Sequence, residues 1–276
     1  MYVNRMQFGF GSGLTPVVKK LLIVNIVVFV MQMFTQPFGE PITRLFALRP
    51  NFVITHFAIW QLFTYMFLHG GIFHIFFNMF ALWMFGCEVE RTIGSREFLR
   101  FYILTGIGAG LFHFFFNWNS LSPVIGASGA IYGVLVAFAV LFPDRIVTLL
   151  LFFILPVSIK AKYLVAIFVG ISLLLGIQGQ LFGISDRVAH LAHLGGAAVG
   201  FLLLKKNNLM LDVARRISRR QETKRTMVER HKEEDIRQKR KEVDQILDKI
   251  NQVGFDNISD REKKLLKEFS EFLSRN

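Results

Sequence analysis

Two short stretches, far apart in the sequence, each place a reactive side chain beside glycines. Ser128 lies within residues 124–133 (VIGASGAIYG), and His193 lies within residues 189–196 (AHLAHLGG). Glycine has no side chain, so a substrate or another backbone can approach the serine hydroxyl closely. On its own, the serine stretch favours a small-residue seam between membrane helices. Together with the histidine it indicates acyl transfer, because a neutral imidazole can take the hydroxyl proton during attack on a carbonyl.

The composition indicates a membrane protein over most of the chain. Of the 276 residues, 53% are hydrophobic and 31 are phenylalanine. Apolar runs of this length satisfy their backbone polar groups internally, as membrane-spanning helices. The formal net charge is +12, and 20 of the 32 Lys and Arg residues follow Leu204, which separates a membrane domain from a basic tail. The single Cys87 excludes an intrachain disulfide framework.

Six apolar runs are predicted to cross the membrane, which gives an all-α six-helix bundle. Lys and Arg gather at the N-terminus, after the second and fourth runs and in the tail, so the positive-inside rule places both termini in the cytosol. Residues 35–60 are expected to lie in the membrane interface, and residues 146–162 are expected to form a cytosolic surface loop. The approximate limits of the six runs are 17–34, 71–88, 98–116, 124–142, 163–181 and 188–204.

This topology brings four polar side chains to one layer of the membrane. Ser128 and His193 each lie about five residues, or roughly 8 Å, below the outer surface in the fourth and sixth runs. His74 is expected at a similar depth in the second run, with Asn78 one turn deeper. Polar residues inside a membrane span are candidates for function, so their convergence points to a site.

The four residues and their neighbours suit the hydrolysis of a carbonyl compound. His74, the Asn78 amide and the Ser128 backbone N–H could donate hydrogen bonds to the negative oxygen formed by attack. Tyr132 lies one turn from Ser128 and could stack on His193. No Asp or Glu occurs in the fourth or sixth run, so a serine hydrolase here would work with a Ser-His dyad.

These residues form three ordered motifs on the second, fourth and sixth runs. The motifs are His74-xxx-Asn78, Gly126-x-Ser128-Gly129-xx-Tyr132 and His193-xx-Gly196-xxx-Gly200. The set resembles the rhomboid family of intramembrane serine proteases, over about residues 15–204. One departure is Trp60-Gln61, where many members of that family carry Trp-Arg.

The resemblance implies a role for each motif residue. Ser128 would be the nucleophile, His193 the base, and His74 and Asn78 the oxyanion-hole donors. Gly126, Gly129 and Tyr132 would support the serine, and Gly196 and Gly200 would let the sixth span pack closely on the fourth. The substrates would be transmembrane proteins cut near the outer end of a helix, in a multi-pass protein of the bacterial inner membrane. No cofactor or metal is implied.

The sequence predicts four parts. Residues 1–14 form a flexible cytosolic N-terminus, 15–204 the membrane domain, 205–242 a charged linker and 243–276 a small helical hairpin. Ser259-xx-Glu262 has the pattern of a capping box that opens the second hairpin helix. The apolar faces of the hairpin suit contact with another protein. Interleaved Glu residues and the lack of a recognition motif argue against nucleic acid, while the basic start of the linker suits anionic lipids.

Two alternatives remain open at this stage. One is a catalytically silent relative that binds membrane proteins and hands them on, although both dyad residues are present. The other is a metal transporter that uses histidines as ligands, although no carboxylate or thiolate lies in the same layer. The histidines in question are His69, His74, His190 and His193.

Overall fold

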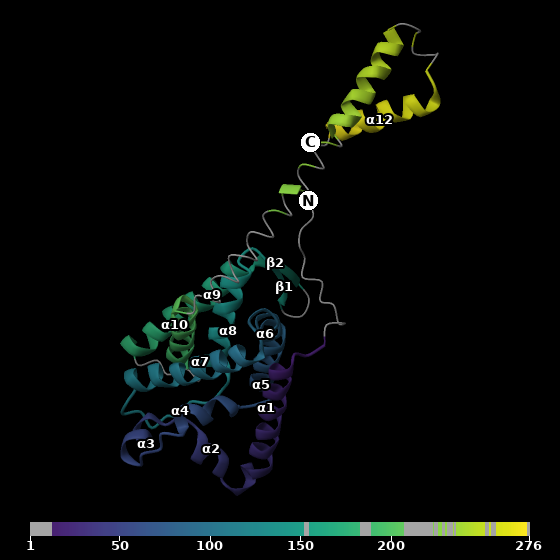
Figure 1. The fold of residues 1–276 in the computed structure, drawn as a ribbon. Helices are drawn as coiled ribbons and strands as arrows, with labels where there is room; N and C mark the ends of the chain where they lie inside the picture. Colours follow the sequence, from purple (N-terminus) through teal and green to yellow (C-terminus); the bar gives the residue numbers. More distant parts are fainter. Residues whose placement is uncertain are drawn as a thin grey trace. The chain divides into compact units, whose positions relative to one another are not determined.

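Long apolar helices make up most of the chain before residue 206 in the computed structural model (Figure 1). The structure describes residues 13–151, 155–182 and 189–206, and in the tail residues 223, 226–227, 230, 234, 236–251, 254 and 258–274. The expected N-terminal segment and most of the expected linker lie outside these residues. The main membrane helices are α1 (Pro16–Thr35), α5 (Ile72–Ala81), α6 (Cys87–Ile93), α7 (Ser95–Phe116), α8 (Ser128–Leu141), α9 (Ala161–Phe182) and α10 (His190–Lys206).

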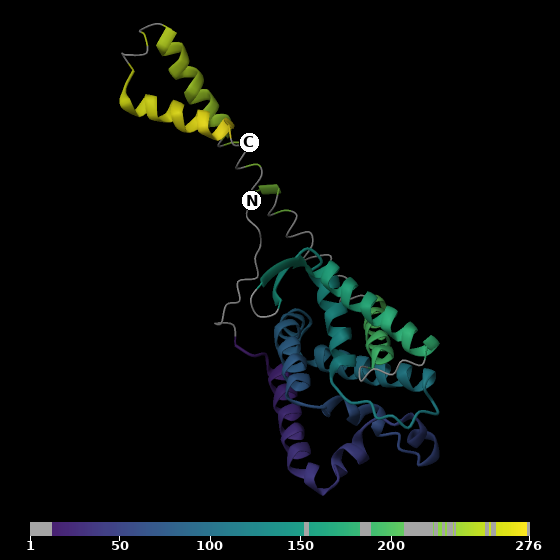
Figure 2. The same cartoon turned by 180° about the vertical axis from the view of Figure 1, so that it is seen from behind.

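The predicted class, an all-α membrane protein with a helical bundle, is confirmed. Among the described residues, four helical segments are long and apolar enough to cross a membrane: Pro16–Phe38, Ile72–Ile93, Ser95–Phe116 and Ala161–Gly179. The second joins α5 to α6 through a π-helical segment, Leu82–Gly86. At the centre of the bundle, α10 packs against both α7 and α8 (Figures 1 and 2). The count of six spans stays a prediction.

Helix α8 is shorter than expected and begins at Ser128, not at Val124. Gly126 has a φ of +129°, in the left-handed region, which no right-handed helix can contain. Val124 instead pairs with Leu48 in an isolated antiparallel bridge. The 14 residues of α8 span about 21 Å, less than the hydrocarbon thickness of about 30 Å. Ser128 therefore lies at a helix end that is sunk into the bundle, and the predicted stripe of small residues starts at Ala130.

The stretch 146–162, expected to form a cytosolic surface loop, is an antiparallel β-hairpin over most of its length. Strands β1 (Ile146–Leu151) and β2 (Leu155–Lys160) pair in register from Ile146 opposite Lys160 to Leu151 opposite Leu155. β-Branched residues occupy the first three positions of β1 and alternate positions of β2, which suits a pleated surface. The hairpin lies at the end of the bundle opposite α2 (Pro41–Phe46) and α3 (Pro50–Thr55) (Figures 1 and 2).

The segment between α1 and α5 is built from short helices and side-chain hydrogen bonds. After α3 come α4 (Gln61–Thr64) and a 3₁₀ turn (Tyr65–Phe67). The Trp60 indole and the Gln61 amide both donate to the Leu45 carbonyl, at 3.0 and 3.2 Å. Gln61 also accepts from the Arg49 N–H at 2.9 Å and is buried. The neutral amide of Gln61 is thus hydrogen-bonded through both its oxygen and its nitrogen inside this segment.

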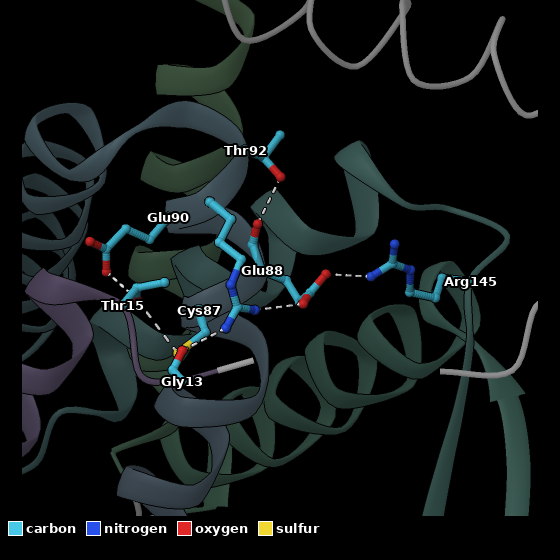
Figure 3. Close-up of polar contacts among 8 residues, drawn as sticks. Gly13, Thr15, Cys87, Glu88, Glu90, Thr92 and Arg145 are labelled. Atoms are coloured by element: carbon cyan, nitrogen blue, oxygen red, sulfur yellow. Dashed lines mark hydrogen bonds and ion pairs between the residues drawn. The ribbon is translucent and has the colours of Figure 1, made fainter. Parts of the chain in front are cut away.

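A buried carboxylate ties three helices together at the other end of the bundle (Figure 3). Glu90 of α6 accepts hydrogen bonds from the Val17 and Val18 N–H groups, at 3.0 and 2.9 Å. These are unpaired donors of the first turn of α1, where a negative charge also suits the helix dipole. The Thr15 and Ser95 hydroxyls donate to the same carboxylate, and Ser95 opens α7. Glu90 therefore holds the starts of α1 and α7 against α6.

The chain divides into two units, residues 1–217 and 218–276. In the second, a helix over 236–251 is followed by α12 (Asp260–Ser274), and the first of these begins within the expected linker, seven residues before the expected hairpin. The capping box is confirmed: the Glu262 N–H donates to the Ser259 hydroxyl and the Ser259 N–H donates to the Glu262 carboxylate. Among the described residues of this second unit, the buried apolar side chains are those of Val243, Ile246 and Ile258.

Candidate active site

Ser128 and His193 lie in direct hydrogen-bond contact. His193 Nε2 is 2.7 Å from Ser128 Oγ, although the two residues are 65 positions apart in the sequence. His193 is buried on α10, and Ser128 is the first residue of α8. An unprotonated Nε2 at this distance can accept the hydroxyl proton. The geometry is that of a nucleophile beside its general base.

Tyr132 fixes the plane of the histidine ring. The Tyr132 and His193 rings are stacked, with centroids 4.3 Å apart and planes 8° apart. The Tyr132 hydroxyl lies 2.9 Å from the hydroxyl of Ser172, which is buried on α9. Stacking over this area leaves the imidazole little freedom to rotate away from Ser128. Helix α9 thus contributes to the site through Tyr132.

His74 reaches the serine from α5. Its Nδ1 accepts a hydrogen bond from the Gly70 N–H at 3.2 Å, so in the neutral ring the proton lies on Nε2, which is a donor. A Cβ atom at Gly126 would lie 2.8 Å from His74 Nε2 and 3.7 Å from Ser128 Oγ. Both side chains therefore border Gly126, and no other residue type would leave room for them there.

Asn78 lies one turn further along α5, and its side chain is buried. Its Nδ2 donates to the His74 carbonyl at 3.0 Å, which uses one of its two N–H groups and leaves the second for another acceptor. In addition, Ser128, Gly129 and Ala130 open α8, so their backbone N–H groups have no partner within the helix. A helix N-terminus carries partial positive charge, which suits an anionic oxygen near Ser128.

Glycines let the backbones of α8 and α10 touch. A Cβ atom at Gly196 would overlap the Gly129 carbonyl, and one at Gly200 would lie 2.8 Å from the Gly133 Cα atom. Gly129 and Gly133 face α7 in the same way, against Ala109 and Thr105. Small residues at such contacts allow close helix packing in membranes. This glycine seam (Gly129, Gly133, Gly196 and Gly200) sets the spacing between the helices that carry the serine and the histidine.

We expect Gly196→Ala to lower stability by about 1–3 kcal/mol, because two backbones must move apart. Gly170→Ala on α9 is the matched control, since a Cβ there meets nothing within 4 Å. Alanine is about 1 kcal/mol more favourable than glycine inside a helix, so the control should be neutral or stabilised. Thermal unfolding of both variants in the same detergent measures the difference. Equal midpoints would show that the seam tolerates the added methyl groups.

The sequence analysis missed two polar residues that support the site. Gln32 of α1 is buried; its Oε1 accepts from the His69 N–H at 2.9 Å and its amide donates to the His69 carbonyl at 3.4 Å. It therefore clamps the turn that leads into His74. Ser172 supports Tyr132 as described above. Both residues are polar side chains inside an apolar run, and this pattern could have identified them from the sequence.

Two further histidines, His69 and His190, each pack against a histidine of the site. The His69 ring lies edge-on to that of His74, with centroids 5.1 Å apart, and the His190 ring lies edge-on to that of His193, with centroids 5.9 Å apart. Within the ranges that the structure describes, no group of three His, Cys, Asp or Glu side chains is arranged to hold a metal ion. No observation of the described residues therefore favours the metal-transport alternative.

The described helices make the chain an integral membrane protein, in which a serine and a histidine are in contact at one helix end. Comparison with known families agrees, since the Rhomboid domain pattern matches residues 56–206. The chain belongs to the rhomboid family. A separate pattern, that of a family of unknown function (DUF6576), matches residues 227–272 in the tail.

Similar proteins occur in plants and bacteria. RHOMBOID-like protein 1 of Arabidopsis thaliana is 32% identical over 167 residues, 60% of this chain and 39% of that protein. Rhomboid protease GluP of Bacillus subtilis is 43% identical over 90 residues, 33% of this chain and 17% of that protein. Rhomboid protease AarA of Providencia stuartii is 27% identical over 217 residues, 70% of this chain and 73% of that protein. The chain thus spans less than two thirds of the first two relatives.

Proposed function

We propose that the chain is a serine endopeptidase that cleaves transmembrane helices of other membrane proteins with a Ser128–His193 dyad. The observation that carries the proposal is the 2.7 Å contact between His193 Nε2 and Ser128 Oγ at the sunken N-terminus of α8. Membership of the rhomboid family, and relatives named as rhomboid proteases, support it. A silent relative would have no need of an aligned nucleophile and base.

The mechanism follows from the positions of the side chains. Ser128 Oγ attacks the scissile carbonyl carbon while His193 Nε2 takes the hydroxyl proton. The carbonyl oxygen becomes negative and is stabilised by His74 Nε2–H, the free Asn78 N–H and the Ser128 backbone N–H. His193 then gives its proton to the leaving amine, and an acyl-enzyme on Ser128 remains. Water, deprotonated by His193, hydrolyses this ester and restores the serine.

The substrate class is set by the depth of the dyad. A peptide bond inside a helix is shielded by its own hydrogen bonds, so the segment to be cut must leave the helical state first. Small or helix-weakening residues near the outer end of a transmembrane helix meet this requirement. The charge distribution favours a chain with both termini in the cytosol, and we propose the inner membrane of a bacterium as its location.

Cleavage of a generic substrate tests the function. The purified full chain is reconstituted in liposomes with a single-span protein that has small residues near the outer end of its helix. Mass spectrometry of the products should locate one main cut within or next to the hydrophobic segment. A matched substrate with leucines at those positions should be cut more slowly. Intact substrate under all conditions, with correctly folded protein, would favour the silent-relative alternative.

The tail is proposed to form a separate part that binds another protein. Residues beyond Lys206 supply none of the proposed catalytic groups, and the division at residue 217 is consistent with a tail that folds by itself. We expect removal of residues 208–276 to leave the unfolding midpoint of the membrane domain unchanged. The rate of cleavage of the generic substrate should stay within about twofold of that of the full chain. Substrate choice in cells is expected to change. A truncated protein that folds but does not cleave would show that the tail acts on the site.

A further inference from the structure

The β-hairpin has one wholly aliphatic face. Alternate residues of a strand point to the same side of the sheet, and the register pairs them across the two strands. The opposite face is mixed, with a Thr148–Ser158 hydroxyl contact of 2.9 Å and Lys160. The described side chains of the aliphatic face are those of Val147, Leu149, Leu155, Val157 and Ile159.

Within the part of the chain that the structure describes, the bundle buries this face at its base and leaves its far end exposed. Val147 is fully buried, and Leu149 and Ile159 pack half-buried against the core of the bundle. At the far end Leu155 is 58% exposed. Val157 is also half-buried, so the exposed part of this face, among its described side chains, is its far end at Leu155.

The base of the hairpin is fixed to the bundle by charged groups. Arg145, directly before β1, pairs with Glu88 of α6 (Figure 3) and lies over the Phe142 ring at 4.2 Å. Lys160 and Lys162 both pair with Asp144, and the hydrogen bond from Lys162 holds the pKa of that carboxyl below its usual value. The pairs therefore persist at neutral pH. The orientation of the aliphatic face is set by the bundle.

Two physical requirements then limit where the hairpin can lie. Its sheet has two strands in the described part of the chain, so each strand has one edge of backbone N–H and C=O groups without a ladder partner. Such edges are excluded from hydrocarbon, where nothing can hydrogen-bond them. An exposed aliphatic face is in turn unfavourable in water, by about 25 cal/mol per Å². The boundary between the two media satisfies both requirements.

We propose that the hairpin lies flat in the membrane–water interface of the protein's own bilayer, with its aliphatic face on the acyl chains. Helix α9, an apolar candidate span, follows β2 directly in the chain, so the hairpin lies at the end of a membrane helix. Lys160 and Lys162, 46% and 42% exposed at their side chains, lie at the depth of anionic headgroups. The exposed apolar residues on this face of α9 are Tyr163, Ile167, Ile171 and Leu174.

Spin labels on the two faces test the proposal. Leu155→Cys and Ser158→Cys are both exposed positions, so folding should survive, and the single native Cys87 is buried and reacts slowly. The full chain is reconstituted in phosphatidylcholine vesicles with and without phosphatidylglycerol. Collision with oxygen reports contact with lipid, and collision with a water-soluble nickel chelate reports contact with water. The oxygen-to-nickel ratio is expected to be several times higher for the label at Leu155→Cys than for that at Ser158→Cys.

Each other outcome contradicts the proposal in a different way. Equal and high nickel collision at both labels would place the hairpin in water. Low collision with both reagents at Leu155→Cys would mean that protein covers the face, either the tail or a second copy. The label at Leu155→Cys should also lie deeper when phosphatidylglycerol is present, and this shift should vanish in Lys160→Gln/Lys162→Gln. A depth independent of phosphatidylglycerol would refute the headgroup contact.

Discussion

Ser128→Ala should reduce cleavage of a single-span substrate below detection. Removal of the nucleophile of a serine protease lowers kcat by about 10⁶-fold, and what remains comes from the oxyanion hole and binding alone. The variant should fold normally, because Ser128 is half-buried and loss of its hydroxyl removes a single side-chain contact, that with His193. A fluorophosphonate probe, which reacts with activated serines, should label the unaltered chain and not the variant.

Ser122→Ala is the matched control for this experiment. Ser122 is exposed in the loop before α8, so loss of its hydroxyl changes neither the site nor the fold. It should keep full activity and full labelling. Substantial cleavage by Ser128→Ala, or labelling at another serine, would remove Ser128 from the proposed role and with it the dyad mechanism.

His193→Ala should lose about as much activity as Ser128→Ala, because a serine hydroxyl without a base is a poor nucleophile and paired catalytic residues act as a unit. The double variant should therefore be no worse than either single variant. His190→Ala should retain most activity, since the His190 ring lies edge-on to the His193 ring with centroids 5.9 Å apart and His193 Nε2 is the nitrogen beside Ser128. Turnover of the same liposome substrate ranks the three variants.

The ranking distinguishes two assignments of the base. If His190→Ala were inactive and His193→Ala active, α10 would present its other face to the serine in the working enzyme.

Tyr132→Phe supplies a further comparison, because it keeps the ring stacked on His193 and removes only the hydroxyl that contacts Ser172. It should lose far less activity than Tyr132→Ala.

The convergence of Ser128 and His193 could be predicted because it depends on local patterns. Apolar length sets each span, charge bias sets its direction, and equal depth follows from counting residues. Ser128 and His193 do lie in contact, as predicted, although α8 starts later than expected. The start of α8 depends on the positive φ of Gly126 and on the bridge between Val124 and Leu48, which are 76 positions apart. No pattern within residues 117–127 reports that bridge.

Other features of the fold could not be predicted from the sequence for related reasons. The β-hairpin has strands as apolar as the helices around it, and short apolar runs do not distinguish strand from loop or buried helix without their partner. The link of Glu90 to the first turn of α1 joins residues more than 70 positions apart, which no local pattern reports. Gln32 stands out as a polar residue in an apolar run, but its backbone partner at His69 is 37 positions away.

The glycine seam has a consequence for how this sequence can diverge. Because backbone atoms of α8 and α10 meet directly, the separation of nucleophile and base does not depend on the rotamer or volume of any large side chain. The bulky residues on the outer surfaces of the bundle can therefore be exchanged to suit another lipid composition or another substrate. The geometry of the site is therefore independent of the residues that face the lipid. Substitutions should be poorly tolerated at the four glycines of the seam and well tolerated on the outer surfaces.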